Sequence, residues 1–346
     1  MAYMFGVLIV RPFGIILMMI YSLVQSYGLA VILFALLAQI LLLPLGYKSK
    51  QGMRKMSAVQ GQMQELQKRY ANNKVKLNEE MQKLYEKEHI NPMSGCLPTA
   101  IQFPILMGLY YAVQKPLTFM MGLGEADVGM LATKVGVEMT QQNAATVQLT
   151  IAQALNKFVD AGGHFVSDIT NLSSDIATYL VPINFNFMGL DLSLTPQFKH
   201  PGIIWIIPIL SGLTAFLSSY IMQKMQGNAV QGQMKTMMYL MPLMSVYFGF
   251  IFPASIGIYW VARNVLMMVQ EMILTKVLNK RHPIETPEQA KEREAEERRR
   301  RHEENLRRVQ EEKESGLAVQ DGKAVKSKPN PNTSRKKLEK EKKKGD

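Results

Sequence analysis

The 346-residue sequence contains a single cysteine, Cys96, so no disulfide can form within the chain. One cysteine also falls short of the four protein ligands of a structural zinc site. The sequence has no glycine-rich nucleotide loop and no cluster of metal-ligating residue types. These absences predict a protein with no catalytic residue, no metal and no cofactor.

Charge is missing from long stretches of the chain. No Asp, Glu, Lys or Arg occurs in residues 27–47, 202–223 or 236–262. A helix of about 20 apolar residues, at roughly 1.5 Å per residue, matches a hydrocarbon core of about 30 Å. The sequence therefore predicts a membrane protein built from helices.

Five membrane spans are predicted from the apolar stretches. The last apolar stretch, which begins at residue 236, is too long for one span. Pro253 divides it into two spans, because proline ends a helix and removes a backbone donor. The predicted fold is an all-α membrane protein, with spans at residues 27–47, 97–121, 201–223, 236–252 and 254–276.

The loops between the spans differ in charge. Residues 48–91 hold ten Lys and Arg against five Glu, whereas residues 122–200 hold three Lys against seven acidic residues. The connection 224–235 and the tail 278–346 are also net basic. Because basic loops stay in the cytoplasm, the N-terminus is predicted outside and the C-terminus inside. The lack of an Arg- and Ser-rich transit peptide favours a bacterial inner membrane.

Three segments outside the spans predict further helices. Residues 1–26 contain an Arg-Pro pair, so residues 13–25 are expected to lie along the outer interface as an amphipathic helix. A sixth span or a retained signal anchor is the alternative. Residues 48–96 should form a cytoplasmic helical hairpin that turns at residues 71–73. The enlarged extracytoplasmic loop, residues 122–200, should be a small and weakly packed helical cap.

The tail, residues 278–346, alternates in charge as far as about residue 314 and then becomes rich in lysine. A solvated helix followed by disordered chain is expected. The basic runs 298–301 and 342–344 favour contact with ribosomal RNA, because such clusters bind phosphate without sequence preference. Attraction to anionic lipid is the alternative.

Two motifs identify a family. The junction into the second span contains Asn91, Pro92, Gly95, Cys96 and Pro98, and it continues as IQFPI over residues 101–105. This junction closely resembles the NPxxGCxP…IQxPI signature of YidC-type insertases, the YidC/Oxa/Alb family. A second match is FPA at residues 252–254, which leads to the Tyr-Trp pair at 259–260. The similarity covers about residues 12–280.

The junction motif also makes physical sense. Pro92 and Pro98 would end the cytoplasmic arm and begin the span, while Gly95 permits close backbone approach. Cys96 is then a small buried hydrophobic residue. A reactive thiol is the alternative, but no basic neighbour in the sequence would activate it.

The resemblance implies a function and its partners. Members of the family help nascent membrane proteins enter the bilayer through a hydrophilic groove among five helices, without enzymatic activity. An arginine of the first span draws the polar outer tail of the substrate into that groove. Contact with the ribosome rests on the basic tail, and the sequence leaves open whether the Sec translocon is a further partner. At the position that matches the arginine, this sequence has Gln39.

Arg263, in the middle of the fifth span, is the hypothesised replacement. It follows Trp260, which matches the family's groove-facing aromatic residue, by three positions, so the two should share a helix face. Gln39 and Gln102 would then be uncharged hydrogen-bonding groups of the groove. Alternatively, Arg263 pairs with Glu271 or extends towards the cytoplasm.

Other function classes stay open at this stage. A small-molecule transporter would be expected to contain inverted repeats, which five unequal spans do not provide. A membrane-anchored ribosome-binding protein would need little more than the spans and the basic tail. A membrane-bound enzyme would need clustered titratable residues, and His200 with Glu271 does not make such a cluster.

Overall fold

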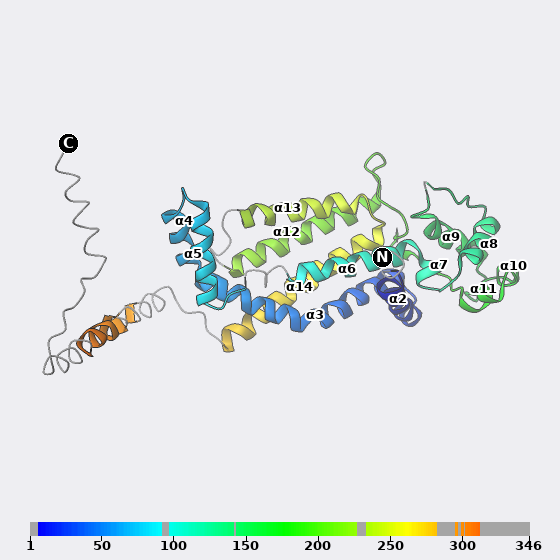
Figure 1. Cartoon of the computed structure of the whole chain (residues 1–346). Helices are drawn as coiled ribbons and strands as arrows, with labels where there is room; N and C mark the ends of the chain where they lie inside the picture. The colour runs from blue at the N-terminus through cyan, green and yellow to red at the C-terminus, as the bar shows by residue number, and fades with distance from the viewer. Residues whose placement is uncertain are drawn as a thin grey trace. The chain divides into compact units, whose positions relative to one another are not determined.

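The computed structural model, which describes residues 6–91, 97–141, 143–226, 233–281 and short helical pieces between 295 and 311, is built mainly of helices. Residues up to Ile284 form one unit and Glu285–Asp346 form another. Five long helices make up the centre of the first unit (Figure 1): α3 (Tyr27–Ala58), α6 (Leu97–Gln114), α12 (Ile206–Gln226), α13 (Gln233–Gly249) and α14 (Ala254–Arg281). Helix α14 packs against both α3 and α12, α12 packs against α13, and α6 contacts α3 and α14.

Two helical stretches among the described residues are long and apolar enough to cross a membrane, Tyr27–Ala58 and Ile203–Met225. The second of these joins the short 3₁₀ helix η4 (Ile203–Trp205) to α12. Helices α6 and α13 are shorter, at 18 and 17 residues. Helix α14 is longer but carries Arg263 and Glu271 within its length.

Helix α3 runs through two segments that were predicted to be separate elements. The predicted first span, residues 27–47, and the start of the predicted hairpin are one continuous helix to Ala58. The hairpin itself consists of α4 (Gln60–Arg69) and α5 (Lys74–Lys87). Asn73 caps α5, because its side-chain oxygen accepts the Lys76 N–H at 3.0 Å. A small apolar core around Val59, Leu84 and Ile90 holds the hairpin together.

The N-terminal helix has two apolar faces. A π-helical turn, η1 (Gly6–Val10), leads into α2 (Arg11–Val24), which packs against α3 and α6. Leu17 and Tyr21 are buried on one face of α2, whereas Met19 and Leu23 are exposed on the other. An apolar face exposed in this way needs a lipid or protein partner.

The segment 122–200 is a well-packed cap, so the expected weak packing is wrong. It contains α8 (Glu125–Val135), α9 (Val147–Leu155), η3 (Asn156–Phe158), α10 (Ser167–Thr170) and α11 (Ser174–Tyr179), and α7 (Pro116–Phe119) leads into it. Apolar residues at helical spacing fill its core, and Leu131, Ile151, Ile169 and Ile176 are fully buried. These residues sit within a polar segment, which hides their periodicity in the sequence.

The cap also contains a β-hairpin that the sequence analysis missed. Strand β1 (Asn186–Phe187) pairs antiparallel with β2 (Leu190–Asp191), with Phe187 opposite Leu190. Met188 and Gly189 form the turn with φ of 55° and 83°. Two positive φ values are typical of the tightest hairpin turns. Phe187 packs on Gly28, so the hairpin joins the cap to the first turn of α3. In Figure 1 the cap and the α4–α5 hairpin lie at opposite ends of the helical bundle.

Candidate functional site

Four polar residues of α14 form a group that we call the polar ladder: Tyr259, Arg263, Gln270 and Glu271. Tyr259, Arg263 and Gln270 follow one another at four and seven residues, so they share a helix face. The ladder has hydrogen-bonding or ionic partners on α3 and α6 at three of its four positions. Polar side chains at the contacts between three helices of an apolar bundle are candidates for a functional site.

Gln102 joins α6 to the ladder. Its side-chain amide donates a hydrogen bond to the hydroxyl of Tyr259. Tyr259 is almost completely buried. The glutamine of the IQFPI motif therefore meets α14, as a groove-lining role for Gln102 would require.

Arg263 lies one helical turn beyond Tyr259 on the same face of α14. Its Nε is buried and finds no hydrogen-bond partner among the described residues. The alternative pairing with Glu271 is not formed, because Glu271 pairs with Lys50. A buried donor without an acceptor is costly, so the Nε–H of Arg263 can donate to an incoming anionic or polar group.

Gln39 of α3 contacts the ladder at Gln270. Its amide donates to the side-chain oxygen of Gln270 at 2.7 Å. Close by, a Cβ added to Gly46 would lie 2.5 Å from the Gln270 amide nitrogen. The side chain of Gln270 thus fits against α3 because residue 46 has no side chain. Gln39 has no hydrogen bond to Gln102 or Arg263.

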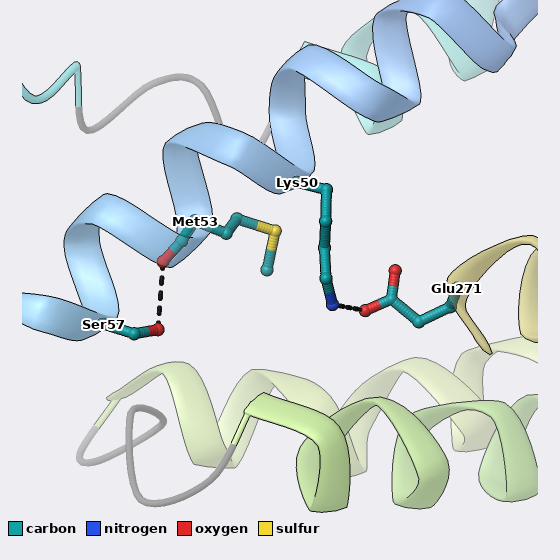
Figure 2. Close-up of polar contacts among 4 residues, drawn as sticks. All are labelled: Lys50, Met53, Ser57 and Glu271. Carbon is teal, nitrogen blue, oxygen red and sulfur yellow. Dashed lines mark hydrogen bonds and ion pairs between the residues drawn. The ribbon is translucent and has the colours of Figure 1, made fainter. Parts of the chain in front are cut away.

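Lys50 of α3 and Glu271 of α14 form an ion pair (Figure 2). Their side chains are only 6% and 13% exposed. Figure 2 shows the lysine reaching from α3 to the carboxylate, with Met53 and Ser57 further along the same helix. Sequence reasoning missed this pair. The one available signal was that Glu271 is the only acidic residue within the five long helices.

Trp260 belongs to an aromatic stack rather than to the ladder. Its ring is stacked on Phe248 of α13, with centroids 5.7 Å apart and planes at 9°. Phe252, in the turn between α13 and α14, completes the stack at 6.2 Å. This stack fixes α14 to α13, and the neighbouring Tyr259 carries the polar contact.

The junction motif lies mostly outside the described residues. Pro92, Gly95 and Cys96 are among the residues that the structure does not describe, and Pro98 is described only as part of the first turn of α6. Asn91 is exposed at the end of the hairpin segment. Within the described ranges, no group of three His, Cys, Asp or Glu residues could hold a metal ion.

Comparison with known proteins gives the family. Residues 19–281 match the family described as 60Kd inner membrane protein. The membrane protein insertase YidC of Oceanobacillus iheyensis is 27% identical over 73% of this chain and 75% of its own length. The membrane protein insertase MisCA of Bacillus subtilis is 27% identical over 75% of this chain and 74% of its own length.

Some relatives are much longer than this chain. The membrane protein insertase YidC of Beijerinckia indica is 30% identical over 78% of this chain, but the match spans only 37% of that protein. In each case the shared part is most of the present chain. Since the family match runs from within α2 to the end of α14, the chain belongs to the 60Kd inner membrane protein family, the family of the YidC-type insertases.

Proposed function

We propose that this chain is a membrane protein insertase, which helps newly made proteins enter the bilayer through a hydrophilic groove beside the polar ladder. The observation that carries the groove is Arg263, whose Nε is buried and has no acceptor among the described residues. The relatives support the function, because they are insertases of the same family.

In this mechanism Arg263 is the cation that attracts the polar outer tail of a substrate. Gln102 is hydrogen-bonded to Tyr259 and Gln39 to Gln270, so both supply uncharged polar groups to the path. A polar path lowers the desolvation cost of moving a hydrophilic tail across the bilayer. Burial of the substrate's apolar segment in lipid, at about 25 cal/mol per Å² of apolar surface, then supplies the driving force.

We further propose that α3, α6, α12, α13 and α14 are the five spans, with α2 on the outer interface. The cap would face outwards, and the α4–α5 hairpin and the basic tail would face the cytoplasm. The exposed apolar side chains of α2 support its place at the lipid surface. Nascent membrane proteins are the substrates in this scheme, with the ribosome and the Sec translocon as further partners. For the ribosome, the supporting observation is the exposed helical piece at residues 302–311, which carries Arg307 and Arg308.

The role of Arg263 is tested with purified protein in liposomes and a single-span substrate that has an acidic outer tail. Arg263→Ala should lower insertion about tenfold, which corresponds to roughly 1.4 kcal/mol. Arg263→Lys should keep most of the activity, because the positive charge is retained. Lys276→Ala is the control, since Lys276 is an exposed cation of the same helix. Normal insertion by Arg263→Ala would disprove the assigned role.

A further inference from the structure

We infer that Lys50 is a specificity-determining residue, which neutralises Glu271 and thereby keeps the polar ladder attractive to acidic substrate tails. The inference rests on the proposed insertase function. It assigns a role to an ion pair that joins α3 to α14 (Figure 2).

The charges of the ladder and its partners sum to a positive value. Lys50 and Glu271 cancel each other, and Tyr259, Gln270, Gln39 and Gln102 are uncharged. Arg263 is then the single uncompensated charge of the group, which carries a net charge of about +1. Without Lys50 the group would have no net charge, since Arg263 and Glu271 would balance.

Glu271 lies further along α14 than Arg263. Eight residues separate the two on α14, a rise of roughly 12 Å at 1.5 Å per residue. In the proposed topology Glu271 is nearer the cytoplasm, so an acidic tail meets it before it meets Arg263. An unpaired carboxylate there would repel the tail and weaken the field of the guanidinium.

Burial makes the pairing of Lys50 with Glu271 persistent. The Lys50 side chain is 6% exposed and that of Glu271 13%. Loss of one member of a buried pair leaves the other charge uncompensated, so the bound state of the pair is strongly favoured. Gln39 and Lys50 are eleven residues apart, which places them on the same face of α3. The contact between Gln39 and Gln270 therefore holds the same two helix faces together.

The experiment compares two single-span substrates that differ only in the outer tail, one with aspartates and one with asparagines at the same positions. Lys50→Met should lower insertion of the acidic substrate about tenfold and leave that of the neutral substrate nearly unchanged. Lys50→Met combined with Glu271→Gln should restore the acidic substrate, because no carboxylate is left in the group. Lys48→Met is the matched control, an exposed lysine of the same helix.

A purely structural role for the pair gives different results. Lys50→Met would then lower insertion of both substrates equally, and that outcome would overturn the proposal. Failure of the double variant to restore insertion of the acidic substrate would also overturn it. If Lys50→Met does not fold, the exchange Lys50→Glu with Glu271→Lys decides instead. The exchange keeps the net charge, so the exchange variant should insert the acidic substrate as the unchanged protein does. A folded exchange variant that inserts only the neutral substrate would contradict the proposal. Absence of insertion by the unchanged protein would instead refute the insertase function itself.

Discussion

At the scale of single residues, Gly14 marks a close approach between α2 and α7. A Cβ added there would lie 2.1 Å from the carbonyl oxygen of Phe119, a backbone atom that cannot rotate away. Gly14→Ala should therefore destabilise the protein by roughly 1–3 kcal/mol through overpacking. Gly129→Ala is the matched control, because Gly129 lies within α8 with nothing near its missing Cβ. Alanine there should stabilise the helix by about 0.5–1 kcal/mol.

Thermal unfolding in detergent, followed by circular dichroism, compares the two glycine variants with the unchanged protein. The melting temperature should fall for Gly14→Ala and should stay the same or rise for Gly129→Ala. Equal melting temperatures for the two variants would show that α2 does not pack as closely on α7 as described.

Residue-level reading of the sequence found candidate polar residues but not their partners. Gln102 and Arg263 stand out because they are polar groups in apolar helices. The partners of Gln39 and Lys50 lie 231 and 221 positions away in the sequence, and no local pattern specifies such pairings. Trp260 was expected to share a cavity with Arg263, but its stacking on Phe248 depends on how α13 packs against α14. The sequence therefore indicated some polar residues of the site, whereas Lys50, Gln270 and the pairings between helices required the fold.

At the scale of elements, Tyr21 connects α2 to the cap. Its hydroxyl donates to the carbonyl of Pro182 and accepts the N–H of Asn184, both at 2.9 Å. Burial raises the pKa of Tyr21, so the phenol stays a neutral donor at physiological pH. Tyr21→Phe removes both hydrogen bonds and should loosen the cap by about 1–3 kcal/mol, because two backbone groups lose their partner.

Limited proteolysis measures this loosening, since cleavage of the cap follows its local opening. Tyr21→Phe should speed cleavage within residues 122–200 and leave the helical bundle intact. Tyr179→Phe should have no effect, because the Tyr179 side chain is 54% exposed. If Tyr21→Phe is as resistant as Tyr179→Phe, then the cap is not held through α2.

Prediction of the elements succeeds where one property dominates the sequence. Absence of charge marks the long apolar helices, and proline with its neighbours marks the corner between α13 and α14. The continuity of α3 past residue 47 is harder to see, because hydropathy changes there while helix propensity does not. The cap was misjudged for a related reason: its apolar residues are spread through a polar segment, and its core forms only when α8 and α9 pack together.

At the scale of the whole molecule, the chain combines a family scaffold with an unusual distribution of charge. Family membership covers α2 to α14, and the match spans three quarters of some relatives but little more than a third of others. The position of the expected arginine holds Gln39, and Arg263, whose Nε is buried, lies on α14. The proposed groove therefore depends on α14, with Lys50 and Glu271 setting the charge at its cytoplasmic side.

The most direct test of the account is insertion by the purified, unmodified protein in liposomes without any other factor. A single-span substrate is synthesised in their presence, and protease is then added outside the vesicles. Protection of the substrate's translocated tail, dependent on the reconstituted chain and absent from empty liposomes, is the predicted result. A tail that is digested equally in both preparations would contradict the insertase function.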